Sequence, residues 1–303
     1  HHYDEAVAVW MRRNRMNRKL THPGEVGPLR TELARAGLQP DTTVHSYSDW
    51  IPDGLFDAHP EWFALVGGKR IRHRDGGQLC LASREMRRAF AANLGEYLTA
   101  HPEIAVIGIC PEDGYGWCEC EDCRKFADGS DYVYTFVNRV ARAVRQAYPD
   151  MNFYTQEKGN SYNHPPKGVM LEPHFTVAVE TGYPYRKDYS ASFSLFEAWK
   201  AAGARTVIRG YPRLPAMKDY LICNQGEIVR MLREMKGKTD GMQVSDGSMY
   251  RFKVHYACCV LTNSIQAKAL FNPDLDLDRE MRGFCDLAYP GAGKEMAGFY
   301  RVM

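Results

Sequence analysis

The sequence predicts an α/β fold, a (β/α)8 TIM barrel whose first strand precedes residue 1. Short apolar runs rich in Val and Ile alternate with amphipathic helical patterns, as in parallel strands joined by crossover helices. Seven candidate strands follow an opening helix, and no Gly-rich phosphate loop follows any of them, which argues against a doubly wound nucleotide-binding sheet. Since α/β barrels commonly reach this length undivided, we expect one domain over residues 1–303.

The predicted strands are short and apolar. The clearest runs from Ile104 to Cys110, because it is rich in Ile and Val and is stopped by Pro111. The seven candidate strands cover residues 15–20, 42–50, 104–110, 151–157, 175–180, 206–211 and 241–246.

Apolar residues recur at helical spacing between these strands. Pro28 near a first turn and Gly37 as a stop bound one predicted helix, and Ser83 is the expected N-cap of the next. The other expected helices cover residues 3–14, 132–148, 194–202, 226–235 and 254–270, with further helical segments in 278–303.

The composition excludes several classes of protein. A formal net charge of +2 argues against a dedicated nucleic-acid binder, which needs a concentrated basic face. No apolar run reaches the length of a membrane span. Nine cysteines are an odd number and too few for a disulfide scaffold of this length. The first residues, His1 to Asp4, form no signal peptide, and we expect the chain to begin inside a longer protein.

Polar residues stand at the ends of six successive predicted strands. In a barrel these C-terminal strand ends form one face, where the active site lies. The sequence therefore predicts a site built from His45, Glu112 with Asp113, Glu157, Glu180, Tyr211 and Asp246.

The adjacent carboxylates Glu112 and Asp113 are the first candidates for catalysis. Glycoside hydrolysis needs a proton donor at the leaving oxygen and a negative or nucleophilic group at the anomeric carbon. Where the sugar carries a 2-acetamido group, its carbonyl oxygen can be the nucleophile, and a protein carboxylate then orients the amide. The structural alternative is that one carboxylate caps the turn before Gly114.

The other candidates each have a structural alternative. Glu157 and Glu180 are reserve catalytic groups, unless they are salt-bridged carboxylates. Aromatic rings and hydrogen-bonding side chains can contact a sugar, but they more often pack in a core. The predicted sugar contacts are His45, Tyr47, Trp50, Tyr115, Trp117, Tyr183, Tyr211 and Asp246.

Cys118, Cys120 and Cys123 form a C-x-C-x-x-C pattern that suits a shared tetrahedral zinc. The fourth ligand would come from Cys110, Cys80 or a histidine such as His73. A closed Cys-rich site is structural, so we expect no cofactor for catalysis. In an oxidising compartment the same residues could instead form a disulfide with one thiol left over.

Several sequence blocks together resemble a bacterial family once catalogued only as a domain of unknown function. That family is similar to glycoside hydrolase family 163, the endo-β-N-acetylglucosaminidases that act on complex N-glycans. The blocks are HPEWFA at 59–64, GKR at 68–70, QLCLAS at 78–83, Asp113-Gly114 with WCEC at 117–120 and Cys123, and FNPD at 271–274.

The resemblance implies a TIM-barrel catalytic domain, preceded by a small α/β domain outside this chain, in exported proteins of glycan-foraging bacteria. It also implies a retaining, substrate-assisted route. We therefore expect a hydrolase of β-linked N-acetylglucosamine in N-glycan-type substrates, with Glu112 as acid/base and Asp113 orienting the acetamido group. Two alternatives stay open: an α-glucuronidase-like barrel that uses Arg186 or Arg209, and a non-catalytic carbohydrate-binding barrel.

Overall fold

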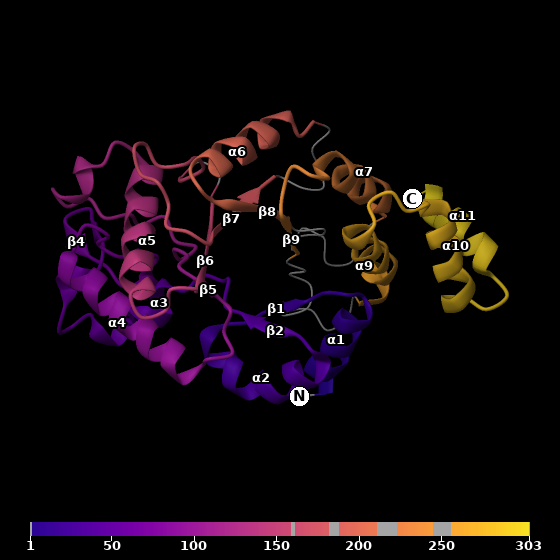
Figure 1. Ribbon diagram of the computed structural model, residues 1–303, viewed down its shortest axis with the longest axis horizontal. Helices are drawn as coiled ribbons and strands as arrows, with labels where there is room; N and C mark the ends of the chain where they lie inside the picture. The colour runs from indigo at the N-terminus through magenta and orange to yellow at the C-terminus, as the bar shows by residue number, and fades with distance from the viewer. Residues whose placement is uncertain (1, 159–160, 182–187, 211–222, 245–255, 303) are drawn as a thin grey trace. The chain divides into compact units, whose positions relative to one another are not determined.

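The computed structural model describes residues 2–158, 161–181, 188–210, 223–244 and 256–302. The chain divides into two compact units that interleave along the sequence. Unit 1 comprises residues 1–12, 17–178 and 197–206, and unit 2 comprises residues 13–16, 179–196 and 207–303. Figure 1 shows the helices and strands of both.

The first strands of unit 1 are parallel. Strand β1 (Arg18–Leu20) pairs in parallel with β2 (Gln39–Asp41). Thr42, directly after β2, forms a parallel bridge with Ile107 in β5 (Val106–Gly108). Gly108 has no room for a side chain, because an added Cβ would lie 2.3 Å from the carbonyl oxygen of Thr42. The start of the chain is thus tied to the strand that precedes Glu112.

The parallel pairing continues from β5 through β6 (Asn152–Gln156) to β7 (Phe175–Glu180). Ile107 lies opposite Phe153, and Phe153 lies opposite Phe175, so apolar side chains form a continuous row across the sheet. Buried parallel strands are typically this apolar, because helices cover the sheet faces.

Helices α1 (His2–Arg13), α2 (Pro23–Ala36), α4 (Arg84–Ala100) and α5 (Gly129–Arg145) alternate with these strands. Helix α2 ends at Gly37, whose φ of 66° is the left-handed conformation that glycine favours. Helices α4 and α5 pack against each other in unit 1 (Figure 1).

Side-chain caps begin two of these helices. The Ser83 hydroxyl accepts the backbone N–H of Met86 at 3.2 Å at the start of α4, which confirms the predicted N-cap. Asp128 accepts the N–H of Asp131 at 2.9 Å at the start of α5.

The segment between β2 and α4 contains short elements rather than one open loop. They are α3 (Tyr47–Trp50), the 3₁₀ turns η1 (Asp53–Leu55), η2 (Pro60–Trp62) and η3 (His73–Asp75), and the antiparallel pair β3 (Leu65–Val66) and β4 (Lys69–Arg70). A further 3₁₀ turn, η4 (Cys123–Lys125), precedes α5.

Unit 2 contains most of the C-terminal half of the chain. Val207 in β8 (Arg205–Gly210) pairs in parallel with Gly241 in β9 (Gly241–Val244). The larger sheet has the strand order β5-β6-β7-β8-β9, which is the sequence order. The described residues of this part of the chain contain the helices α6 (Ser190–Ala201), α7 (Gln225–Met235), α9 (Tyr256–Phe271), α10 (Leu277–Ala288) and α11 (Gly293–Val302).

The predicted α/β class and parallel pairing are confirmed, but two local predictions were wrong. The second strand is Gln39–Asp41 rather than 42–50, because Tyr47–Trp50 is helical. Pro28 lies inside α2, whose first turn carries Pro23 instead. Closure into an eight-stranded barrel and a single undivided domain stay predictions. Among the helices described, none has the length and apolar character needed to cross a bilayer.

Candidate active site

The turn that follows β5 carries Glu112 and Asp113, and the buried side chain of Gln78 holds it. Nε2 of Gln78 donates to the carbonyl oxygens of Glu112 at 2.7 Å and Gly114 at 2.8 Å. Its Oε1 accepts the backbone N–H of Glu112 at 3.1 Å. A single amide thus fixes the backbone on both sides of Asp113, since Gln78 is fully buried.

Glycines allow this turn to lie directly on the segment that precedes Gln78. An added Cβ at Gly114 would lie 2.3 Å from the carbonyl oxygen of Gly76, and one at Gly116 would lie 2.7 Å from it. The N–H of Gly116 donates to that same oxygen, and Gly77 and Gly116 form a parallel bridge. A side chain at Gly114 would therefore push the turn away from its support.

The Glu112 side chain is half-buried and points toward α3. Its Oε1 accepts the backbone N–H of Ser48 at 2.7 Å. Ser46 ties this region to β5, because its hydroxyl donates to the carbonyl oxygen of Gly108 and accepts the N–H of Cys110. The Glu112 carboxyl group is therefore positioned by two segments far apart in the sequence.

The Asp113 carboxylate is exposed and lies between two nitrogen-bearing side chains. Its Oδ1 is 3.3 Å from Nε2 of His45 and 3.3 Å from Nζ of Lys158. Lys158 also donates to the Asp113 carbonyl oxygen at 2.6 Å. Positive charge beside this oxygen favours a carboxylate that acts as an anion rather than a proton donor.

His45 is held in a defined orientation. Its Nδ1 contacts the carbonyl oxygen of Pro111, an acceptor, so Nδ1 carries a hydrogen. Nε2 is then the ring nitrogen that faces Oδ1 of Asp113. The side-chain amide of Gln156, at the end of β6, lies 3.1 Å from Nδ1.

Tyr115 and Trp117 follow the carboxylates with different exposures. Tyr115 is 74% exposed, and Nζ of Lys158 lies 4.3 Å from the centre of its ring. Trp117 is half-buried and meets Tyr132 and Tyr162 in edge contacts, with ring centres 6.0 and 5.6 Å apart. Tyr115 is the better placed of the two for stacking on a sugar.

Tyr47 and Trp50, expected as sugar contacts, lie in the core. Tyr47 is fully buried, with its ring centre 5.5 Å from those of Phe90 and Phe136. Trp50 is 3% exposed and packs on Phe90 and Tyr97. A direct sugar contact would require the core to open, so these two residues are assigned a packing role instead.

The reserve carboxylates have contrasting positions. Glu157 is 2% exposed. The burial of Tyr134 in α5, together with the nearby charge of Glu157, raises the pKa of Tyr134 well above its usual value. Glu180 is exposed at the end of β7 and belongs to unit 2. The remaining predicted contacts, Tyr183, Tyr211 and Asp246, lie outside the described residues, as does Arg186.

Three residues of this site were not among the predicted ones: Gln78, Gln156 and Lys158. Lys158 and Gln156 flank Glu157 at the C-terminal end of β6, so the strand-end rule that selected Glu157 could have found them. Gln78 has no comparable signal, because it acts on a turn 34 residues away.

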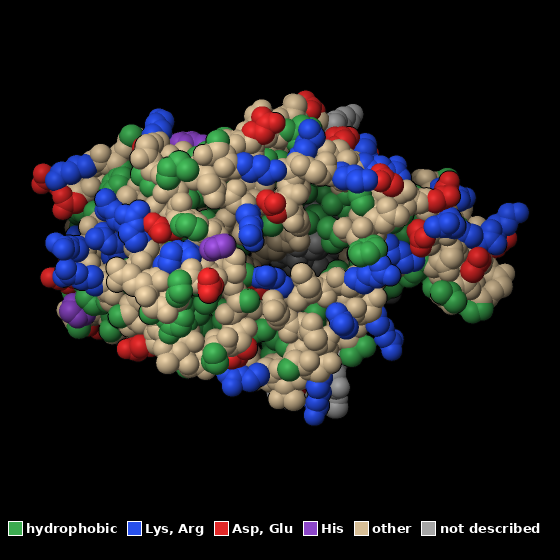
Figure 2. All heavy atoms as spheres, in the orientation of Figure 1, with side chains coloured by type: hydrophobic (Ala, Val, Ile, Leu, Met, Phe, Trp, Pro, Cys, Tyr) green, Lys and Arg blue, Asp and Glu red, His purple; other side chains and the backbone are tan. Residues whose placement is uncertain are grey.

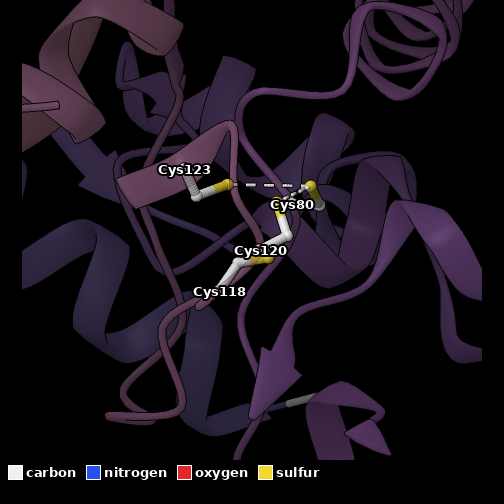
Figure 3. Close-up of side chains that lie close together, drawn as sticks. All are labelled: Cys80, Cys118, Cys120 and Cys123. Atoms are coloured by element: carbon white, nitrogen blue, oxygen red, sulfur yellow. Dashed lines mark hydrogen bonds between the residues drawn. The ribbon is translucent and has the colours of Figure 1, made fainter. Parts of the chain in front are cut away.

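The cysteine cluster lies beside this turn. Sγ atoms of Cys80, Cys118, Cys120 and Cys123 all lie within 4.8 Å of one another and converge in Figure 3. They could hold a metal ion such as zinc. Of the alternatives predicted for the fourth ligand, Cys80 is the one that lies in the cluster. Cys110 instead contacts the carbonyl oxygen of Tyr154, 4.0 Å from its sulfur.

Interactions among the thiols make their acidities unequal. Hydrogen bonds with Cys123 and Cys80 hold the pKa of Cys118 well below its usual range. The hydrogen bond with Cys118 raises the pKa of Cys80 to about 12, and the one with Cys118 also raises that of Cys123.

The surface face in Figure 2 carries both Lys or Arg and Asp or Glu side chains, interspersed with polar and apolar ones. This mixture agrees with the small net charge of +2.

A family model described as a domain of unknown function, DUF4838, matches residues 3–301. The chain belongs to this family. Comparison with curated proteins gave no match.

Two solved structures show distant resemblance to this DUF4838 chain. One is a variant of the GH36 alpha-galactosidase AgaA from Geobacillus stearothermophilus, with 12% identity, a TM-score of 0.44, and coverage of 80% of this chain and 32% of that chain. The other is Dispersin B, with 8% identity, a TM-score of 0.42, and coverage of 81% and 74%. The chain thus spans about a third of the length of the alpha-galactosidase it matches.

Proposed function

We propose that this chain is a glycoside hydrolase that cleaves β-linked N-acetylglucosamine in N-glycan-type substrates. The reaction would be retaining and substrate-assisted, in a barrel domain of an exported protein. The observation that carries the proposal is the pinned turn after β5, which presents one half-buried carboxyl group and one exposed carboxylate side by side. Such a pair suits a proton donor next to an acetamido-orienting group.

Glu112 is the proposed general acid/base. It protonates the leaving glycosidic oxygen while that oxygen's bond to the anomeric carbon breaks. The acetamido carbonyl oxygen of the sugar forms the new bond to the anomeric carbon, giving a cyclic oxazolinium intermediate. Water then opens this ring at the anomeric carbon, and the ionised Glu112 takes the proton from that water.

Asp113 is the proposed partner of the acetamido N–H. Its position beside Lys158 and His45 supports an anionic role, since it would have to accept a hydrogen bond from the amide and offset positive charge in the oxazolinium ring. His45 and Lys158 would fix the orientation of Asp113. Tyr115 would supply a stacking face for a sugar ring.

The test is mass spectrometry of the products after the 303-residue chain is incubated with a glycoprotein that carries complex N-glycans. Released oligosaccharides with one N-acetylglucosamine at the reducing end are expected. Release of uronic acid from xylan fragments would instead support an α-glucuronidase-like enzyme. Glycan binding without any product would support a carbohydrate-binding barrel.

A matched pair of variants assigns the activity to the site. Glu112→Gln should slow release by about 10²–10⁴-fold, whereas Glu96→Gln, at an exposed position on α4, should leave it intact. Equal release by both variants would overturn the assignment of Glu112.

A further inference from the structure

We propose that Cys80, Cys118, Cys120 and Cys123 bind a structural Zn²⁺ ion that fixes the turn carrying Glu112 and Asp113. The proposal stands on the geometry of the four sulfurs and the contacts around them. It does not depend on the glycoside hydrolase assignment.

The sulfur positions match a tetrahedral thiolate site. Zn–S bonds of about 2.3 Å place the sulfurs of a regular tetrahedron about 3.8 Å apart. Sγ of Cys80 lies 3.6 Å from that of Cys120 and 3.7 Å from that of Cys123, and all four lie within 4.8 Å of one another. Figure 3 shows the sulfurs converging from separate segments of the chain.

Hydrogen-bond donors around the cluster are suited to thiolate ligands. The backbone N–H of Leu65 donates to Sγ of Cys118 at 3.3 Å, and a guanidinium nitrogen of Arg70 lies 3.7 Å from the same sulfur. The hydroxyl of Tyr132 lies 3.2 Å from Sγ of Cys123. Four thiolates around a divalent ion leave a net charge of about −2, which Arg70 partly offsets.

Zinc explains the arrangement better than a disulfide. A disulfide joins two sulfurs and leaves the others out, whereas here all four share one small volume. Three of the cysteines are buried and Cys120 is half-buried, so the four ligands would form a closed site. Closed four-cysteine sites are structural, because no coordination position is left for substrate or water.

The ion would act on the proposed catalytic turn because two of its ligands lie only two residues along the chain from residues that hold the turn. Cys80 is two residues after Gln78, whose amide holds Glu112, and Cys118 is two residues after Gly116, which bridges Gly77. Each of the two contacts that support the turn is therefore close in sequence to a metal ligand. Binding one ion to Cys80 and Cys118 would fix the distance between the two segments that make these contacts.

Metal analysis of the purified chain is the first test. We expect about one zinc per chain, and reconstitution with cobalt should give the thiolate charge-transfer and visible bands of a tetrahedral cobalt–thiolate centre. Cys120→Ser should lose the metal, whereas Cys285→Ser, at a buried cysteine of α10, should keep it. If Cys120→Ser does not fold, cobalt reconstitution of the unaltered chain still decides the point.

Two results would overturn the site: reduced protein that binds neither zinc nor cobalt, or mass spectrometry that finds a disulfide among these cysteines in the protein as isolated. Neither readout uses a glycan, so failure of the proposed enzymatic function cannot be mistaken for failure of the metal site.

Hydrogen exchange tests the link to the turn. Removal of zinc by a chelator under reducing conditions should speed amide exchange in residues 76–81 and 111–118 and leave α10 unchanged. Unchanged exchange in both segments after complete metal loss would show that the ion does not fix the turn.

Discussion

The side-chain amide of Gln78 bonds to both backbone polar groups of Glu112, donating to its carbonyl oxygen at 2.7 Å and accepting its N–H at 3.1 Å. A carboxamide suits this pairing, because it offers a donor and an acceptor side by side. Glu112 therefore depends on a residue that never touches its carboxyl group.

Replacing Gln78 with leucine should show how much catalysis depends on the position of Glu112, because the carboxyl group itself is unchanged. The substitution keeps a buried side chain of similar size but leaves three backbone groups without their partner. We expect a loss of unfolding free energy on the order of 2 kcal/mol or more, measured by urea denaturation. Misplacement of Glu112 should also lower kcat by about 10²-fold. Gln146→Leu, at an exposed position, is the control, and unchanged kcat in Gln78→Leu would contradict the positioning role.

Tyr115 should contribute to binding more than to chemistry. Removing its exposed ring in Tyr115→Ala takes away a stacking surface, which should raise KM roughly 3- to 10-fold with little change in kcat. Tyr115→Phe keeps the ring and should keep the KM. A fall in kcat at constant KM in Tyr115→Ala would place Tyr115 in the reaction itself rather than in substrate binding.

Asp41 should make stability depend on pH. Burial raises its pKa from 3.8 to about 7, while Arg18 and a hydrogen bond with Thr43 act in the opposite direction. Because the folded state holds this proton more tightly than the unfolded state, stability should fall as pH rises from about 4 to about 7 and level off above that.

Asp41→Asn removes this ionisation, so the variant should lose that part of the pH dependence. At pH 7 the variant should be more stable than the parent chain, by at most a few kcal/mol and on the order of 1 kcal/mol after partial solvent relaxation. Unfolding free energies of both proteins between pH 4 and pH 8 provide the check. Parallel curves for the two proteins would exclude Asp41 as the source of the dependence.

The sequence predicted those parts of the molecule that follow from local pattern. Apolar runs such as Ile104 to Cys110 located the parallel strands, and the spacing of Cys118, Cys120 and Cys123 located the cluster. The choice of Cys80 over Cys110 could not be made, because it depends on how two distant loops meet.

Tyr47 and Trp50 show how one local error propagates. In an extended strand they would point to opposite faces, and we expected both near a sugar. In the helix Tyr47–Trp50 they are three residues apart and share a face, which turns both into the core. The contacts of Gln78 were missed for another reason, since they follow from tertiary register and leave no periodic signal.

In the proposed reaction Glu112 protonates the leaving oxygen during cleavage of a β-N-acetylglucosaminide. The most direct measurement compares kcat/KM of Glu112→Gln on an N-glycan and on an aryl glycoside of the same sugar with a good leaving group, such as dinitrophenolate. We predict a loss of about 10²–10⁴-fold on the glycan, whose leaving oxygen needs the proton, and a much smaller loss on the aryl glycoside, which does not. Equal losses on both substrates, or none on the glycan, would contradict the role of Glu112 as the proton donor.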